Sequence, residues 1–355
     1  MVGLSALAAA PAGAHYEHPE DRQAAQTARK AQGSDTAQAG DSDQHDPWKL
    51  LEMAMSPAYA ASTNVHITIS GAYRIITSNG IPDHQTGAFP NSGNPNRISE
   101  QRYLFRVALH PEAAASSTAI GMYPFGVAIN GIPFDPSANE WWHRNPRSGW
   151  QYEAMTLGPR LGLDQNNAHV QPNGAYHYHG LPVGLVNKIA NHPKPLLLGY
   201  AADGFPIYGP YGHSDPADAS SQMVELKSSY RLKPGQRPGA RSQSGLEPGG
   251  SYDGSFVQDW EFVEGVGNLD ECNGRFGVTA EYPEGIYHYI ITTAYPYIPR
   301  RLKGQADPTF YRHGHIGPPA GGRGQPGRLG RPGGGFGPPP GWRPPPGTGP
   351  AVRTY

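Results

Sequence analysis

Two histidines stand two residues apart in the segment 176–179, which reads Tyr-His-Tyr-His. Successive side chains on a β-strand point to opposite faces, so His177 and His179 would project from one face and the two tyrosines from the other. Same-face neighbours lie about 7 Å apart, because a strand rises about 3.3 Å per residue. Two imidazoles at that spacing can converge on one metal ion. This segment is therefore the first candidate for a metal site.

Two further histidines can join this pair. His169 precedes it across the segment 171–174, Gln-Pro-Asn-Gly, which is typical of a turn, so a hairpin would bring His169 beside the pair. His288 lies in a second copy of the pattern Gly-X-Tyr-His-Tyr, found at 174–178 and again at 285–289. The predicted ligands are thus His177, His179, His169 and His288. Ligation by nitrogen alone suits copper or zinc and does not suit calcium or magnesium.

Other polar residues near these motifs are candidates for an additional ligand, for a partner that orients an imidazole, or for a general base. They are Asp164, Asp203, His84 and Asp270. Simpler roles remain open for all of them: Asp203 is in a turn dipeptide, and paired histidines can be solvated or hydrogen-bonded core residues.

The elements that must position these side chains are predicted to be strands. Alternating or β-branched and aromatic segments occur at 65–70, 73–77, 102–109, 125–129, 196–201 and 287–293. Asn-Gly or Asp-Gly dipeptides at 79–80, 130–131 and 203–204 provide turns between them. The pattern predicts an all-β single domain, a sandwich or a jelly-roll-like fold with long ordered loops, flanked by disordered termini.

The ends of the chain differ in composition from its middle. Residues 1–14 are small and apolar and end in an Ala-Gly-Ala sequence, which predicts a signal-peptide remnant and a periplasmic or secreted protein. Residues 15–61 are expected to be a disordered linker, and residues 304–355 a disordered basic tail rich in glycine and proline. The domain itself is predicted over residues 62–303. The tail could contact a cell-wall or polysaccharide surface, or serve only as a spacer.

Composition and missing motifs exclude several classes of protein. The formal net charge of −1 argues against a specific nucleic-acid binder, and no apolar run is long enough for a transmembrane segment. The chain has no phosphate-binding loop, no dinucleotide fingerprint, no serine-hydrolase elbow and no zincin motif, so no nucleotide or organic cofactor is expected. Its one cysteine, Cys272, cannot form a disulfide within the chain.

Six longer motifs resemble those of the YHYH-domain family. They are SNGIPDH at 78–84, FGVAINGIPFDP at 125–136, GAYHYHG at 174–180, LLGYAADGFPIYG at 197–209, LDECNGRFG at 269–277 and YPEGIYHYIITTAYPYIPR at 282–300. The resemblance covers about residues 62–303 and implies an exported protein, but it supplies no established catalytic residue. In this family a cysteine usually follows PYIPR and could pair with the cysteine of DECNGR. Here that position is Arg301, so the resemblance implies no such cross-link.

The function predicted from these residues is transition-metal binding, with copper or zinc held by the histidine cluster. Two alternatives stay open. The first is a metal-dependent oxidoreductase or hydrolase, which would need an open coordination position. The second is a metal-free surface adhesion or polysaccharide-binding domain that uses Trp141, Trp142 and Trp150. The sequence alone does not decide whether the protein is an enzyme.

Overall fold

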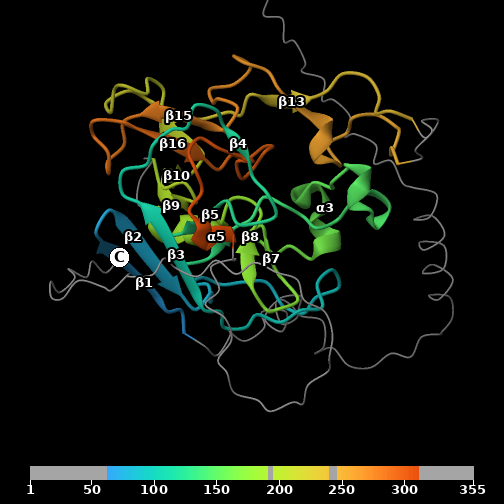
Figure 1. The fold of residues 1–355 in the computed structure, drawn as a ribbon, viewed down its shortest axis with the longest axis horizontal. Coiled ribbons are helices and arrows are strands. Elements are labelled where there is room, and N and C mark those ends of the chain that lie inside the picture. Colours follow the sequence, from blue (N-terminus) through green and yellow to red (C-terminus); the bar gives the residue numbers. More distant parts are fainter. Residues whose placement is uncertain (1–61, 191–194, 240–245, 312–355) are drawn as a thin grey trace, which may run out of the picture. The chain divides into compact units, whose positions relative to one another are not determined.

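The computed structural model describes residues 62–190, 195–239 and 246–311 (Figure 1). The predicted signal-peptide remnant, the predicted linker and most of the predicted tail lie outside these residues. Within them, most regular structure is β, which confirms the all-β prediction. None of the helices in the described part of the chain has the length and apolar character needed to span a bilayer.

The strands of the described residues follow one another along the chain as β1 (Val65–Ser70), β2 (Tyr73–Ser78), β3 (Tyr103–Ala108), β4 (Thr118–Ala119), β5 (Gly126–Ala128), β6 (Pro133–Phe134), β7 (Ala168–Val170), β8 (Tyr176–Tyr178), β9 (Leu197–Ala201), β10 (Pro206–Tyr208), β11 (Tyr211–His213), β12 (Met223–Glu225), β13 (Tyr230–Leu232), β14 (Trp260–Phe262), β15 (Gly274–Gly277), β16 (Ile286–Ile290) and β17 (Arg301–Leu302). The helices are η1 (Trp142–Arg144), η2 (Pro146–Ser148), α3 (Ala154–Leu161), α4 (Val183–Ile189), η3 (Val257–Asp259) and α5 (Pro308–Tyr311). All of the strands expected from the sequence pattern are present, with ends that shift by a few residues.

One sheet carries both Tyr-His-Tyr motifs. Its strand order is β15-β16-β10-β9-β5-β6-β8-β7, and Figure 1 follows this order from β15 to β7. The central strands β9 and β5 are antiparallel. On each side of this pair comes an antiparallel hairpin partner, then a parallel neighbour, then an antiparallel edge strand. We call β5, β6, β8 and β7 the first half-sheet, and β9, β10, β16 and β15 the second half-sheet.

The turns of the two inner hairpins need glycine. Gly131 joins β5 to β6 with φ +77°, and Gly204 joins β9 to β10 with φ +95°. Each donates its N–H across the turn, to the carbonyls of Ala128 and Ala201 at 2.8 and 2.9 Å. A side chain is strained at such positive φ values. The Asn-Gly and Asp-Gly dipeptides therefore act as the sequence pattern predicted.

A separate antiparallel sheet, β1-β2-β3, shares its core with the large sheet. Alternate residues of β3 are buried, including Phe105 and Val107, which belong to the same apolar cluster as Val127 of β5 and Ile207 of β10. Two sheets that bury one face each against the other form a layered β architecture. The three-stranded sheet therefore packs through this shared core against the large sheet that carries the histidine-bearing strands.

The described structure continues past the domain boundary predicted at residue 303. Residues 304–311 were expected to belong to the disordered tail, but they include α5, and Phe310 is fully buried. Its ring packs on that of Phe105, with centroids 4.8 Å apart. Arg106 also pairs with Asp307 at 2.7 Å. The sequence pattern did not mark these residues because only Ala306 and Phe310 of the segment are buried apolar residues, and they show no strand or helix periodicity.

Candidate functional site

The hairpin of β7 and β8 brings His169 and His177 directly opposite each other. The register pairs Ala168 with Tyr178, His169 with His177, and Val170 with Tyr176. The chain reverses between the strands at Gly174, which has φ +86° and donates its N–H to the carbonyl of Gln171 at 2.8 Å. Directly paired residues on antiparallel strands project from the same face with their Cβ atoms about 5 Å apart. The hairpin predicted from the turn signal is therefore confirmed.

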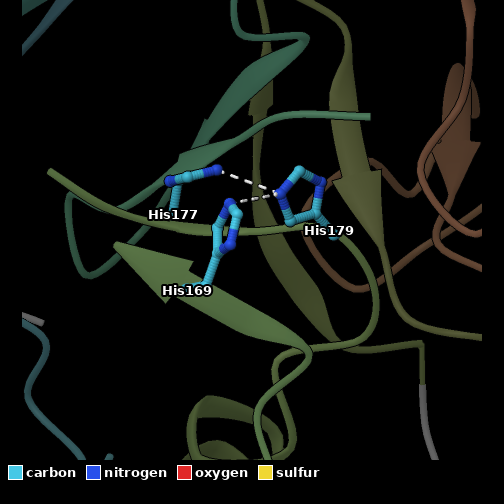
Figure 2. A group of neighbouring side chains, drawn as sticks. All are labelled: His169, His177 and His179. Atoms are coloured by element: carbon cyan, nitrogen blue, oxygen red, sulfur yellow. Dashed lines mark hydrogen bonds between the residues drawn. The ribbon is translucent and has the colours of Figure 1, made fainter. Parts of the chain in front are cut away.

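Three imidazole rings meet at this hairpin with their Nε2 atoms turned toward one another (Figure 2). Nε2 of His179 lies 3.0 Å from Nε2 of His177 and 3.1 Å from Nε2 of His169. Two nitrogens that each lie about 2.0–2.1 Å from one ion, at an angle of about 90–110°, are roughly 2.9–3.4 Å apart. The observed spacings fall in this range. Among the described residues, these three form a group whose ligand atoms all lie within 4.8 Å of one another.

Main-chain carbonyls fix the orientation of two of the rings. Nδ1 of His169 contacts the carbonyl oxygen of Leu161 at 2.9 Å, and Nδ1 of His177 contacts that of Ala175 at 3.2 Å. A carbonyl oxygen can only accept, so both Nδ1 atoms donate a hydrogen. In the neutral rings, each Nε2 then carries a lone pair directed at the centre of the cluster. This is the arrangement in which outer hydrogen bonds prepare imidazoles for a metal.

His179 occupies the buried centre of the cluster. Its Nε2 lies between those of the other two. Burial lowers the pKa of His179 well below its usual range, and the charges of His177 and His169 lower this pKa further. The main chain of Asp135 partly offsets the fall. Burial also lowers the pKa of His169 to about 4. Both rings are thus neutral near pH 7, as ligation requires.

A buried ion pair lies at the N-terminal end of α3, the helix whose Leu161 carbonyl contacts His169. Arg300 pairs with Glu153, and both side chains are almost completely buried. Glu153 also caps α3 by accepting the N–H of Met155 at 3.3 Å, and Leu161 at the other end of α3 accepts from His169. Breaking one partner of such a buried pair is costly. The pair therefore stabilises the N-terminal end of α3, and the last residue of this helix supplies the carbonyl that contacts His169.

Two of the other predicted residues organise the hairpin without contacting the imidazole cluster. Asp164 accepts from the hydroxyl of Tyr176 at 2.7 Å and from the N–H groups of Gly87 and Asn166 at 3.0 and 2.8 Å. His84 accepts at Nε2 from the hydroxyl of Tyr178, 2.6 Å away, because its Nδ1 donates to a carbonyl. The tyrosines therefore project from the opposite face to the histidines, and Asp164 and His84 hold that face.

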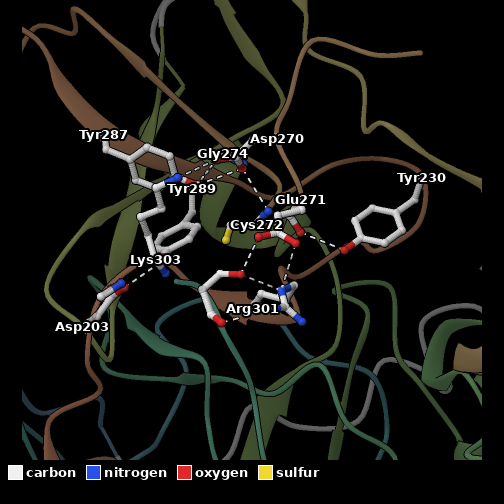
Figure 3. Close-up of polar contacts among 12 residues, drawn as sticks. Asp203, Tyr230, Asp270, Glu271, Cys272, Gly274, Tyr287, Tyr289, Arg301 and Lys303 are labelled. Atoms are coloured by element: carbon white, nitrogen blue, oxygen red, sulfur yellow. Dashed lines mark hydrogen bonds and ion pairs between the residues drawn. The ribbon is translucent and has the colours of Figure 1, made fainter. Parts of the chain in front are cut away.

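The remaining predicted residues lie at the second Tyr-His-Tyr motif, and Figure 3 shows two of them, Asp203 and Asp270. Asp270 accepts from the hydroxyl of Tyr287 at 2.9 Å, and Asp203 accepts from that of Tyr289 at 2.6 Å. Burial raises the pKa of Asp203. His288 is on β16, and the order of the sheet places β10, β9, β5 and β6 between β16 and β8. The structure therefore brings His169, His177 and His179 together but does not bring His288 to them.

Two main-chain carbonyls and two charged side chains affect the imidazole cluster, although nothing in the sequence pattern points to them. The carbonyls of Leu161 and Ala175 are backbone atoms, so no residue type identifies them in advance. The positive charge of Arg300 lowers the pKa of His179, and the negative charge of Asp135 opposes the fall at His169. Both residues lie within the motifs quoted for the family resemblance. Only their place in the fold gives them a role at the cluster.

Two of the tryptophans and the single cysteine noted in the sequence lie away from the imidazole cluster's hydrogen bonds. Trp142 and Trp150 both pack edge-on against Phe256, with ring centroids 5.9 and 5.6 Å away. Cys272 is a buried free thiol. Arg301 lies 3.4 Å from the carboxylate of Glu271, the neighbour of Cys272, so an ion pair joins the two segments that the family resemblance relates by a cysteine pair (Figure 3).

Comparison with known proteins identifies the family of this chain. Neither the curated proteins nor the solved structures that were compared gave a significant match. A family model described as YHYH protein matches residues 104–304, which include both half-sheets and all three clustered histidines. This match covers more than half of the chain and confirms the resemblance found in its motifs. The chain belongs to the YHYH family.

Proposed function

We propose that the domain binds one divalent transition-metal ion, zinc(II) or copper(II), through the Nε2 atoms of His169, His177 and His179. The observation that carries the proposal is the convergence of these atoms at spacings of 3.0 and 3.1 Å. Hydrogen bonds to carbonyls turn the Nε2 lone pairs of His169 and His177 toward the centre of the cluster, where one metal ion could accept both. Three imidazoles with no carboxylate in the group favour zinc or copper over calcium or magnesium.

The chain offers a matched control for the ligand test. His288 resembles His177 in burial and in its hydrogen bond, because its Nδ1 contacts the carbonyl two residues earlier, that of Ile286, at 3.0 Å. Substituting either residue removes a buried imidazole from the centre of a Tyr-His-Tyr strand. Only the His177 substitution removes a proposed ligand.

Metal analysis of the full chain, purified without a histidine tag and dialysed against zinc or copper, tests the proposal. We expect about one equivalent of metal in the unsubstituted protein and in His288→Gln, and a loss of at least tenfold in affinity for His177→Gln. Equal metal content in the two variants contradicts the proposal. Thermal unfolding of both variants shows whether each is folded before its metal content is compared.

A second candidate function follows from the number of ligands. Three protein ligands leave a coordination position for water or substrate, which is the pattern of catalytic rather than structural zinc sites. His169 is partly exposed while the other two histidines are buried, so the cluster is approached from the side of His169. A metal in this site would lower the pKa of a bound water. Hydrolysis of an activated ester by zinc-loaded protein tests this function; activity that survives in His177→Gln contradicts it.

A further inference from the structure

The two half-sheets repeat the same local structure around their Tyr-His-Tyr strands. In the first half-sheet the edge hairpin pairs Ala168 with Tyr178 and His169 with His177, and in the second it pairs Gly274 with Tyr289 and Arg275 with His288. These registers align the two hairpins residue by residue. The same alignment places Ile290 at the position of His179, because each follows the second tyrosine of its motif.

The supporting contacts repeat as well. Asp164 and Asp270 each accept from the first tyrosine of the motif. Each also accepts the N–H groups two and four residues later, and each donates its own N–H to the carbonyl four residues later, at 2.8 and 2.9 Å. Asn167 and Asn273 take the same positive φ in these loops, 55° and 54°. The second tyrosine contacts the turn residue of the inner hairpin in each half, Asn130 or Asp203.

The two half-sheets differ in the side chains at the positions of the imidazole cluster. The second half-sheet keeps one histidine, His288, and has a guanidinium, Arg275, where the first has His169. The aliphatic Ile290 replaces the third imidazole. A metal cation has no ligand set here, and the group that faces His288 across the hairpin is itself a cation.

The charge of Arg275 has no acidic partner among the described residues. Its Nη2 donates to the carbonyl of His213 at 2.8 Å, while its Nε is buried and makes no hydrogen bond in the described part of the chain. Burial lowers the pKa of Arg275, and no nearby carboxylate opposes this fall. A partly buried guanidinium without a counter-charge is costly, and buried charges are normally paired.

The imidazole beside Arg275 adds a complementary group. Nδ1 of His288 faces the carbonyl of Ile286, so it donates, and the Nε2 of the neutral ring is an acceptor. Its ring packs edge-on against Tyr208, with centroids 5.2 Å apart. The carboxylate of Glu281 is engaged by the hydroxyl of Tyr208, at 2.8 Å. Among the described residues, Nε of Arg275 is therefore a donor without a partner, and the imidazole of His288 offers an acceptor on the strand paired with it.

We infer that Arg275 and His288 form an anion site for a hydroxyl-bearing oxyanion of the phosphate class. Hydrogen phosphate can accept from the guanidinium through its oxygens and donate its P–OH to Nε2 of His288. Guanidinium–phosphate hydrogen bonds are charge-assisted and short. Sulfate has no hydrogen to donate at neutral pH, so it matches only half of the site. This inference does not depend on metal binding at the first half-sheet.

Binding of inorganic phosphate to the full chain tests the inference, with chelator present so that no metal at His169, His177 and His179 holds the anion. Isothermal titration should give saturable binding, weaker binding of sulfate, and a loss of about tenfold or more in Arg275→Met. Arg231→Met is the control, because Arg231 is exposed and already paired with Glu261 at 3.0 Å; it should bind phosphate normally.

The inference would be overturned by no binding at millimolar phosphate, by unchanged binding in Arg275→Met, or by loss of binding in His169→Ala, which would place the anion at the first half-sheet. If Arg275→Met does not fold, Arg275→Lys keeps the charge but removes the paired guanidinium donors. This variant should retain weakened phosphate binding, and full affinity in it would also count against the site.

Discussion

His177 and His288 occupy equivalent positions in the two halves of one sheet, and each donates from Nδ1 to the carbonyl two residues before it. His177 has His169 opposite it on β7, whereas His288 has Arg275 opposite it on β15. The two half-sheets thus have the same local backbone structure but carry different functional groups. One half-sheet gathers three imidazole nitrogens, and the other places a cation beside a single imidazole.

The equivalence of the half-sheets predicts that a second metal site can be installed. Arg275→His with Ile290→His would place imidazoles at the positions of His169 and His179, next to His288. We expect the doubly substituted protein to bind about two equivalents of zinc where the unsubstituted protein binds one, measured by titration with a chromophoric zinc indicator. Arg275→His alone is the control and should add much less affinity, since it supplies two imidazoles instead of three. A stoichiometry that stays at one in the folded double variant contradicts the equivalence.

Asp164 and Asp270, which each accept from the first tyrosine of a Tyr-His-Tyr motif, have matched structural roles. Asp164→Asn and Asp270→Asn each remove acceptors for a tyrosine hydroxyl and for main-chain N–H groups. Each should lower the free energy of unfolding by about 1–3 kcal/mol in chemical denaturation. Zinc affinity should fall in Asp164→Asn alone, because this loop leads into the strand of His169. Equal zinc affinity in the two variants would show that the loop does not position the cluster.

The turn of the β7–β8 hairpin requires glycine for two reasons. Gly174 has φ +86°, and a Cβ there would lie 1.8 Å from Oγ of Ser99. Gly174→Ala should therefore destabilise the fold by about 3 kcal/mol or more. Gly235→Ala is the control, because Gly235 has φ +89° but nothing within 4 Å of its Cβ. It should cost only about 1 kcal/mol, from backbone strain alone. Similar costs for both would mean that Ser99 moves aside freely.

Because Asp203 is buried, the stability of the fold should decrease as the pH rises through the pKa of this carboxyl group. Its pKa is raised above the ordinary value of 3.8, so the folded state holds this proton to a higher pH than the unfolded state. The contribution of protonated Asp203 to the free energy of unfolding is complete below its pKa in the unfolded chain. It is lost as the pH rises through its pKa in the folded protein. Asp203→Asn removes this titration. The stability of the unsubstituted protein relative to Asp203→Asn should thus fall as the pH rises above about 4. A difference that is constant with pH, in urea unfolding, contradicts the shift.

Much of the first half-sheet could be predicted from the sequence because its signals are local. The period of two placed His177 and His179 on one face, and the turn at 171–174 predicted the partner strand of His169. Both inferences need only the geometry of a strand and a hairpin. The strands of the three-stranded sheet were visible for the same reason, since one of their faces is solvated and the residues alternate.

The position of His288 could not be predicted in this way. The repeated Gly-X-Tyr-His-Tyr pattern signals a repeated local structure, but it does not say whether two copies face one site or lie apart. Here β10, β9, β5 and β6 separate them, because strand order is set by long-range pairing. The carbonyls that orient the imidazoles and the buried Glu153–Arg300 pair also depend on tertiary contacts, which residue type alone does not reveal.

The central claim is that one ion is held among three Nε2 atoms. Anomalous diffraction from crystals of the zinc- or copper-loaded protein, recorded on both sides of the absorption edge of the metal, tests it most directly. We expect one anomalous peak at about 2.0–2.1 Å from Nε2 of His169, His177 and His179. A peak at other residues, or no peak in the cluster of a crystal grown with excess metal, would contradict the account.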